Sequence, residues 1–108
     1  MIILLSKSNK PDKKYSVLIG RKRIYFGDAA YQDYTQTNDL HKKELYLDRH
    51  SKREDWDDIL SAGFWSRWLL WNKKTISKSV KDKYNSSIIL LIAENLNLNG
   101  YFFSLISK

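Results

Sequence analysis

The chain has 108 residues, 43% of them hydrophobic and 14% aromatic, and a formal net charge of +7. This length suits a single domain, and the absence of cysteine excludes disulfide frameworks, thiolate nucleophiles and cysteine-ligated zinc. No run reaches the ~20 apolar residues of a membrane span, and the short apolar start lacks the basic region and length of a secretory signal peptide.

The charge is divided into three blocks. Residues 1–27 carry seven Lys and Arg against one Asp, residues 28–60 carry nine acids against five bases, and residues 61–108 carry seven bases against two acids. Basic ends therefore flank an acidic middle. Such ends favour attraction to nucleic acid or to acidic protein surfaces, and a lysine-rich solubilising surface is the alternative.

The first part of the chain predicts an arm and a β-hairpin. Residues 1–13 contain the only proline and are expected to form a flexible or extended arm. Residues 15–19 and 23–26 are rich in β-branched and aromatic side chains and are joined through Gly20, which predicts two paired strands. Arg21, Lys22 and Arg23 lie at the hairpin tip, where they are candidates to bind phosphate or are simply hydrated.

The middle of the chain predicts one half-buried helix. Residues 27–36 form a polar connection without clear periodicity, and Asn38 or Asp39 is suited to cap a helix that runs to about Lys52. One side of this helix is expected to carry Leu40, Lys43, Tyr46, Leu47 and His50.

An aromatic helix is predicted over residues 62–72 (AGFWSRWLLWN), with Ser61 as its N-cap after the acidic Asp55, Asp57 and Asp58. At 100° per residue its large apolar side chains cover roughly 160° of the surface; these are Phe64, Trp65, Trp68, Leu69 and Trp71. Ser66, Arg67 and Leu70 fall on the other side. Core packing is the preferred interpretation, and docking of a protein through Arg67 and Trp71 is the alternative.

The last part predicts a basic helix and an apolar extension. Thr75 is suited to cap a helix through Ile76, Val80 and Tyr84, and Lys73 and Lys74 before it are further candidates to bind nucleic acid. Residues 85–108 are apolar and form either a hairpin around Asn99 and Gly100 or a helix over residues 87–98. We expect this extension to pack on the domain or on a partner; its candidate docking residues are Ile88, Leu90, Tyr101 and Phe102.

These elements together predict an α+β protein with one domain over residues 14–84. An N-terminal β-hairpin is followed by two or three short helices and an apolar C-terminal hairpin or helix, with residues 1–13 as an arm and residues 85–108 as an extension.

The order of several motifs resembles a family of small uncharacterised proteins encoded by large DNA viruses. The resemblance covers roughly residues 14–80, and the string at residues 62–72 is its most specific part; the others are YFGD at 25–28, YQDYT at 31–35, His41, Tyr46, Arg49 with His50, and REDW at 53–56. The proline that usually follows the final Asn is absent here. The resemblance implies a viral origin and location in a virion or an infected host cell, and it implies no reaction.

Neither an enzyme nor a metal centre is expected. His41, Glu44 and Asp48 share one helical face at a spacing that could hold a divalent ion, but a mixed polar face without a dedicated motif is more common. His50 lacks a recognisable partner for general-base chemistry, and a hydrogen-bonded core or interface histidine is the preferred interpretation. We therefore predict no catalytic residue, no metal ligand and no cofactor.

Two functions remain open. The leading hypothesis is a small virion-associated structural protein, such as a minor capsid protein, held by other virion proteins through its aromatic and apolar surfaces. The alternative is a nucleic-acid-binding accessory protein that uses the basic hairpin tip and basic ends, and a metal-dependent nuclease is a weaker third. The sequence does not specify an oligomeric state.

Overall fold

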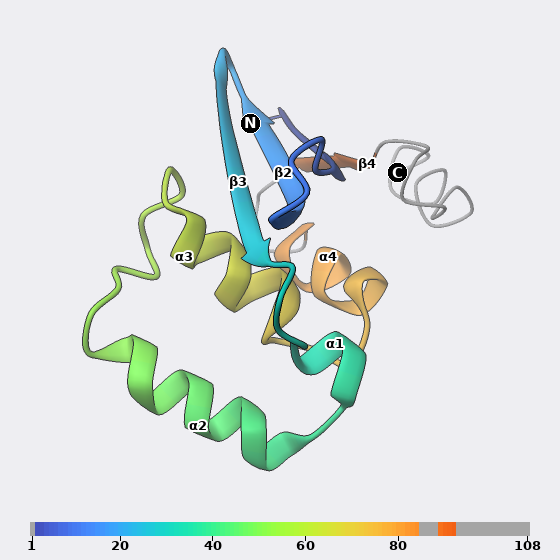
Figure 1. Ribbon diagram of the computed structural model, residues 1–108. Helices are drawn as coiled ribbons and strands as arrows, with labels where there is room; N and C mark the ends of the chain where they lie inside the picture. Colours follow the sequence, from blue (N-terminus) through green and yellow to red (C-terminus); the bar gives the residue numbers. More distant parts are fainter. Residues whose placement is uncertain (1, 85–88, 93–108) are drawn as a thin grey trace.

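A four-stranded sheet and a group of short helices make up the protein (Figure 1), as described by a computed structural model for residues 2–84 and 89–92. The strands are β1 (Ile2–Lys7), β2 (Lys13–Ile19), β3 (Lys22–Asp28) and β4 (Ile89–Ile92), in the spatial order β3-β2-β1-β4. The first three pair antiparallel, and β4 pairs parallel to β1. The expected α+β class is confirmed.

The predicted hairpin forms β2 and β3. Ile19 pairs with Lys22, so the loop contains only Gly20 and Arg21. Gly20 has a φ of +59°, a conformation that glycine adopts without the steric penalty of a side chain. Glycine at the first position of a two-residue loop is typical of type II′ hairpin turns, whose twist matches that of the strands.

The N-terminal segment differs from the expected arm. It is extended, but β1 pairs with β2 on one side and with β4 on the other. Ile3 and Leu5 are 0% and 1% exposed. Full burial at every second position matches a strand with one buried face, so this segment belongs to the core of the domain.

The core lies between one face of the sheet and the helices behind it. Leu5 pairs with Val17, which pairs with Ile24, so that one row of apolar side chains crosses three strands. The helices add Trp65, Leu69, Leu70 and Val80, all nearly inaccessible to solvent. Burial of such side chains contributes roughly 1.5–3 kcal/mol each, and this packing fixes the helices against the sheet.

The helices begin where the sequence places capping residues. They are α1 (Tyr34–Thr37), α2 (Leu40–Ser51), α3 (Ala62–Trp65), the π-helix η1 (Ser66–Leu70) and α4 (Ile76–Tyr84). The side chains of Asp39 and Ser61 accept hydrogen bonds from Lys42 N and Phe64 N, and Thr75 accepts one from Lys78 N. The predicted caps are thus confirmed, whereas α1 was not expected.

The aromatic segment is not a uniform α-helix. Trp71 N donates to Ser66 O at 3.0 Å, a bond across five residues that defines the π-turn of η1. This wider turn changes the angular spacing of the side chains. Leu70, expected opposite the apolar face, is therefore 1% exposed and belongs to the core. Core packing of Phe64, Trp65 and Leu69 is confirmed.

The described part of the C-terminal extension is β4. Residues 89–92 form a strand, which contradicts the alternative of a helix across them. The predicted hairpin at Asn99 and Gly100 lies outside the described residues. Within residues 2–84 and 89–92, no helix has the length and apolar character needed to cross a membrane.

Candidate functional site

A cleft of about 680 Å³ lies between α2 and the body of the domain. One wall is α2, and the other is formed by the start of β2, the end of β3 and the connection to α1. Residues of α3 and η1 close the back. Its size falls within the ~300–1,000 Å³ typical of ligand sites. Figure 1 shows α2 at the opposite end of the molecule from the β2–β3 hairpin tip.

Stacked rings attach α2 to the π-helix. The ring of Tyr46 stacks on that of Trp71 with centroids 4.1 Å apart and an angle of 3° between their planes, and on its other side His50 stacks at 4.0 Å. All three residues line the cleft. Burial raises the pKa of Tyr46 well above its ordinary value, with a further increase from Glu54. The Tyr46 phenol is therefore neutral throughout the physiological range.

Lys43 makes a second attachment of α2. Its Nζ donates to Asn72 O at 2.7 Å and lies over the ring of Tyr34 at 5.0 Å. Burial lowers the pKa of Lys43, and the nearby Arg67 and Lys73 lower it further. Lys43 thus acts as an internal tie, and its ammonium is not a free cation of the cleft.

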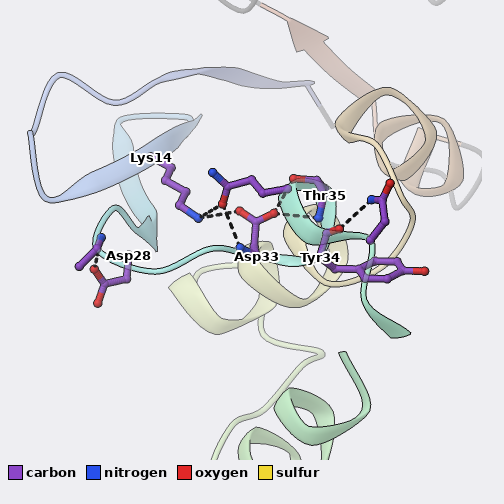
Figure 2. Close-up of polar contacts among 8 residues, drawn as sticks. Lys14, Asp28, Asp33, Tyr34 and Thr35 are labelled. Carbon is purple, nitrogen blue, oxygen red and sulfur yellow. Dashed lines mark hydrogen bonds and ion pairs between the residues drawn. The ribbon is translucent and has the colours of Figure 1, made fainter. Parts of the chain in front are cut away.

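Asp33 lines the cleft, and its carboxylate is hydrogen-bonded and ion-paired to neighbouring residues (Figure 2). Asp33, 3% exposed, accepts hydrogen bonds from Thr35 N at 2.9 Å and from Lys14 Nζ at 2.7 Å. Gln36 Oε1 accepts from Asp33 N and from Lys14 Nζ, which completes a capping box at α1. This network joins the connection after β3 to β2 and holds the charge of Lys14.

The second acidic residue is also paired. Glu54 Oε1 contacts His50 Nδ1 at 3.1 Å, and its Oε2 accepts from Trp56 Nε1 at 2.9 Å. The carboxylate lies so close to Gly63 that a Cβ there would come within 2.9 Å of its carbon. Glycine at this position therefore permits the approach of the acid to the start of α3.

Four cations of the cleft have no partner among the described residues. Its lining includes five Lys and Arg and three Asp and Glu. With Lys14 engaged by Asp33, the side chains of the other four have no hydrogen bond or ion pair to any described residue; these are Lys13, Lys42, Arg49 and Arg53. The third acid, Asp28, is exposed and accepts from Ala30 N at 2.9 Å. The available charge of the cleft is therefore positive.

The predicted phosphate-binding residues are not brought together. Arg21, Lys22 and Arg23 are exposed at the hairpin tip or next to it, although Arg23 donates to Ser16 Oγ at 2.9 Å. Lys73 and Lys74 are exposed in the turn before α4. None of these five residues lines the cleft.

Arg67, expected as an exposed docking residue, is largely internal. Its guanidinium lies 4.2 Å from the ring of Trp68 and 5.3 Å from that of Trp56, and it donates to Trp71 O at 3.0 Å. Burial lowers its pKa. Trp68 Nε1 also donates to Trp56 O at 3.1 Å, which joins the two residues whose rings lie near this guanidinium.

The other docking candidates are only partly described. Trp71 is half-buried in the ring stack. Leu90 lies in β4, where it pairs with Ile3, and Ile88, Tyr101 and Phe102 lie outside the described residues. Docking through this extension stays a prediction.

The metal alternative finds no support in the described part of the chain. There, no group of three or more His, Cys, Asp or Glu side chains lies close enough to hold an ion. His41 and Glu44 are exposed on α2, and Asp48 lies 4.0 Å from Lys52 Nζ. Asp39 caps α2.

Sequence reasoning missed the cleft, although a signal for it was present. Lys42 and Arg49 are seven residues apart and so share one face of α2, and Arg53 follows in the turn just after this helix. The predicted apolar side of this helix includes neither Lys42 nor Arg49, so a prediction from apolar spacing alone does not find the cleft. Lys13 and Tyr31 have no comparable signal, because their places depend on the sheet register and on the connection after β3.

Residues 3–50 match a family of unknown function (DUF5754). No curated protein and no solved structure matches the chain. The matched region includes β1, the hairpin, the connection with Asp33 and most of α2, and it ends before the aromatic segment at residues 62–72.

Proposed function

We propose that the protein binds nucleic acid in the cleft beside α2. The observation that carries this proposal is the unequal use of charge in the cleft: Asp33 and Glu54 are paired internally, whereas Lys13, Lys42, Arg49 and Arg53 have no partner among the described residues. Unpaired cations that line a concave surface attract phosphates and release the counterions bound to them.

The surroundings favour a stable basic surface. The ring stack and the bond from Lys43 hold α2, and the Asp33 network holds the facing connection. The cations therefore sit on two walls that are each attached to the core. Binding energy is lost when a site must first be ordered, and these attachments reduce that loss.

The test compares two variants that each remove two positive charges. One carries Lys42→Gln and Arg49→Gln in the cleft, and the other carries Arg21→Gln and Lys22→Gln at the hairpin tip. Binding of a fluorescein-labelled oligothymidylate about 12 nucleotides long, within the ~4–16 that one such site covers, is followed by fluorescence anisotropy. The salt concentration is varied from about 50 to 200 mM.

The cleft variant is expected to bind more weakly, with a salt slope shallower by about 1.4, since each phosphate contact on a single strand contributes ~0.7. The tip variant should bind like the unchanged protein. Equal losses in the two variants would mean attraction by net charge alone, and absence of binding at low salt would reject the proposal outright.

A role as a virion structural protein stays a prediction from the viral resemblance and from the apolar residues 85–108, most of which lie outside the described residues. The cleft, by contrast, has a lining of described side chains on which the proposal rests.

A further inference from the structure

We infer that the ligand of the cleft is a single nucleic-acid strand, one base of which stacks on Tyr31. This inference rests on the proposed function and adds the class of nucleic acid and the residue that recognises it. Tyr31 lines the cleft and is 72% exposed, the most exposed of the large apolar or aromatic side chains in the described part of the chain. Its ring and hydroxyl contact no described residue through a hydrogen bond, a stacked ring or a cation.

The backbone that carries Tyr31 is held in place. Tyr31 N donates to Asp28 O at 3.2 Å, and the carboxylate of Asp28 accepts from Ala30 N. Ala29 N donates to Asp12 O at 3.0 Å, which ties this turn to the loop before β2. The exposed ring is therefore presented by a braced turn. An aromatic face that is open to solvent and carried on a braced backbone is a feature on which unpaired bases can stack.

The arrangement of charge fits successive phosphates of one strand. Lys42 and Arg49 are seven residues apart on α2, about 10 Å along the helix axis at ~1.5 Å per residue. Such a spacing suits several phosphates along a chain better than one phosphate group. Tyr31 lies on the connection that forms the other wall, so a strand between the walls can place phosphates on α2 and a base on the ring.

The shape of the site disfavours a duplex. Proteins read double-stranded DNA by placing a helix or a β-ribbon into a groove, which requires a projecting basic element. The cleft is concave, and bases of a duplex are already stacked on one another and cannot reach Tyr31. A projecting basic element of the described chain is the hairpin tip with Arg21 and Lys22, which do not line the cleft. This tip and α2 lie at opposite ends of the molecule (Figure 1).

The experiment uses the full chain with three variants: Tyr31→Ala, Tyr31→Phe, and Leu40→Ala as a control. Leu40 is 57% exposed and does not line the cleft. The probes are the labelled oligothymidylate, the same strand annealed to its complement, and thymidine monophosphate as a competitor. Anisotropy at low salt gives each affinity, and circular dichroism verifies that the variants are folded.

Tyr31→Ala is expected to weaken single-strand binding about 5- to 100-fold, as loss of one stacked base does. Tyr31→Phe should retain most of the affinity, because the ring face remains, and Leu40→Ala should change little. The duplex should bind more weakly than the single strand and should be insensitive to Tyr31→Ala.

Three results would overturn the inference. Equal affinity for duplex and single strand, with no effect of Tyr31→Ala, would reject the single strand and leave nucleic-acid binding in the cleft intact. Displacement of the strand by the mononucleotide at comparable concentration would indicate a site for a free nucleotide instead. Failure of both strand and duplex to bind would reject the inference together with the proposed function.

Discussion

Replacement of Asp33 is the sharpest test of how the cleft is held together. Its carboxylate caps α1 through Thr35 N and pairs with Lys14 Nζ, and the side chains of the ion pair are 4% and 14% exposed. Asp33→Ala removes both interactions. Asp33→Asn removes only the charge, because asparagine caps a helix about as well as aspartate.

The expected loss of folding stability in each variant follows from these two interactions. Loss of a cap destabilises by about 1 kcal/mol, and breaking a buried ion pair destabilises by about 3–5 kcal/mol when one charge remains buried without its partner. Lys14 keeps Gln36 Oε1 at 2.6 Å, which places the ion-pair loss at or below the lower end. We expect about 2 kcal/mol for Asp33→Asn and about 3–4 kcal/mol for Asp33→Ala, a large part of the ~5–15 kcal/mol that stabilises a typical domain.

Urea titrations followed by tryptophan fluorescence measure the free energy of unfolding of each variant. A double-mutant cycle that combines Asp33→Asn with Lys14→Met isolates the interaction between the two side chains. The double variant should lose about 1–3 kcal/mol less stability than the sum of the losses in the two single variants. Additive single effects, or a loss below about 0.5 kcal/mol for Asp33→Asn, would refute this account of the network.

Three further predictions concern other contacts. Gly27→Ala should destabilise the protein by about 2–4 kcal/mol in urea titrations, because Gly27 has a φ of +82° and a Cβ would lie 2.8 Å from a Leu70 methyl carbon. Gly20→Ala is the control: its φ is also positive but the space around it is open, so it should lose only about 1 kcal/mol. Burial raises the pKa of Tyr46, so the unfolded chain loses this proton first as the pH rises. The contribution of Tyr46 to the free energy of unfolding should be fully present below about pH 10 and should then fall by up to ~1.4 kcal/mol per pH unit. Tyr46→Phe should make this alkaline decrease shallower, as measured by urea titrations at a series of pH values. Arg67→Ala should destabilise by about 1–3 kcal/mol, seen as a lower Tm by circular dichroism, since its guanidinium is packed between two indoles; an unchanged Tm would return it to the exposed docking role.

The fold could be predicted where the signals are local. The hairpin follows from two β-rich runs around Gly20, and the starts of three helices follow from Asp39, Ser61 and Thr75, because caps act on the backbone within one turn. Even α1 had such a signal, since Asp33 and Gln36 have the spacing of a capping box. The π-turn of η1 could not be inferred, because the prediction assumed the regular 100° per residue of an α-helix across residues 62–72.

The candidate site was less predictable because its charge depends on pairing. The composition of residues 28–60 is acidic, yet in the cleft that they help to form Asp33 and Glu54 are paired, whereas four cations have no partner among the described residues. Charge counts along a sequence do not show which groups neutralise one another in space. Only the structure shows that Lys14 is held by Asp33 and Gln36 while Lys13, one residue earlier, is not.

The parallel pairing of β1 with β4 has a consequence for the order of folding. It joins Ile2 to Ile89 and so closes a loop that includes most of the chain. Contacts between such distant residues form late, because the entropy of closing the loop must be overcome first. Until then the edge of β1, with its apolar side chains, is open to pairing with other chains. During synthesis the antiparallel strands are completed well before residues 89–92 are made, so the edge of β1 stays unpaired by β4 throughout that interval.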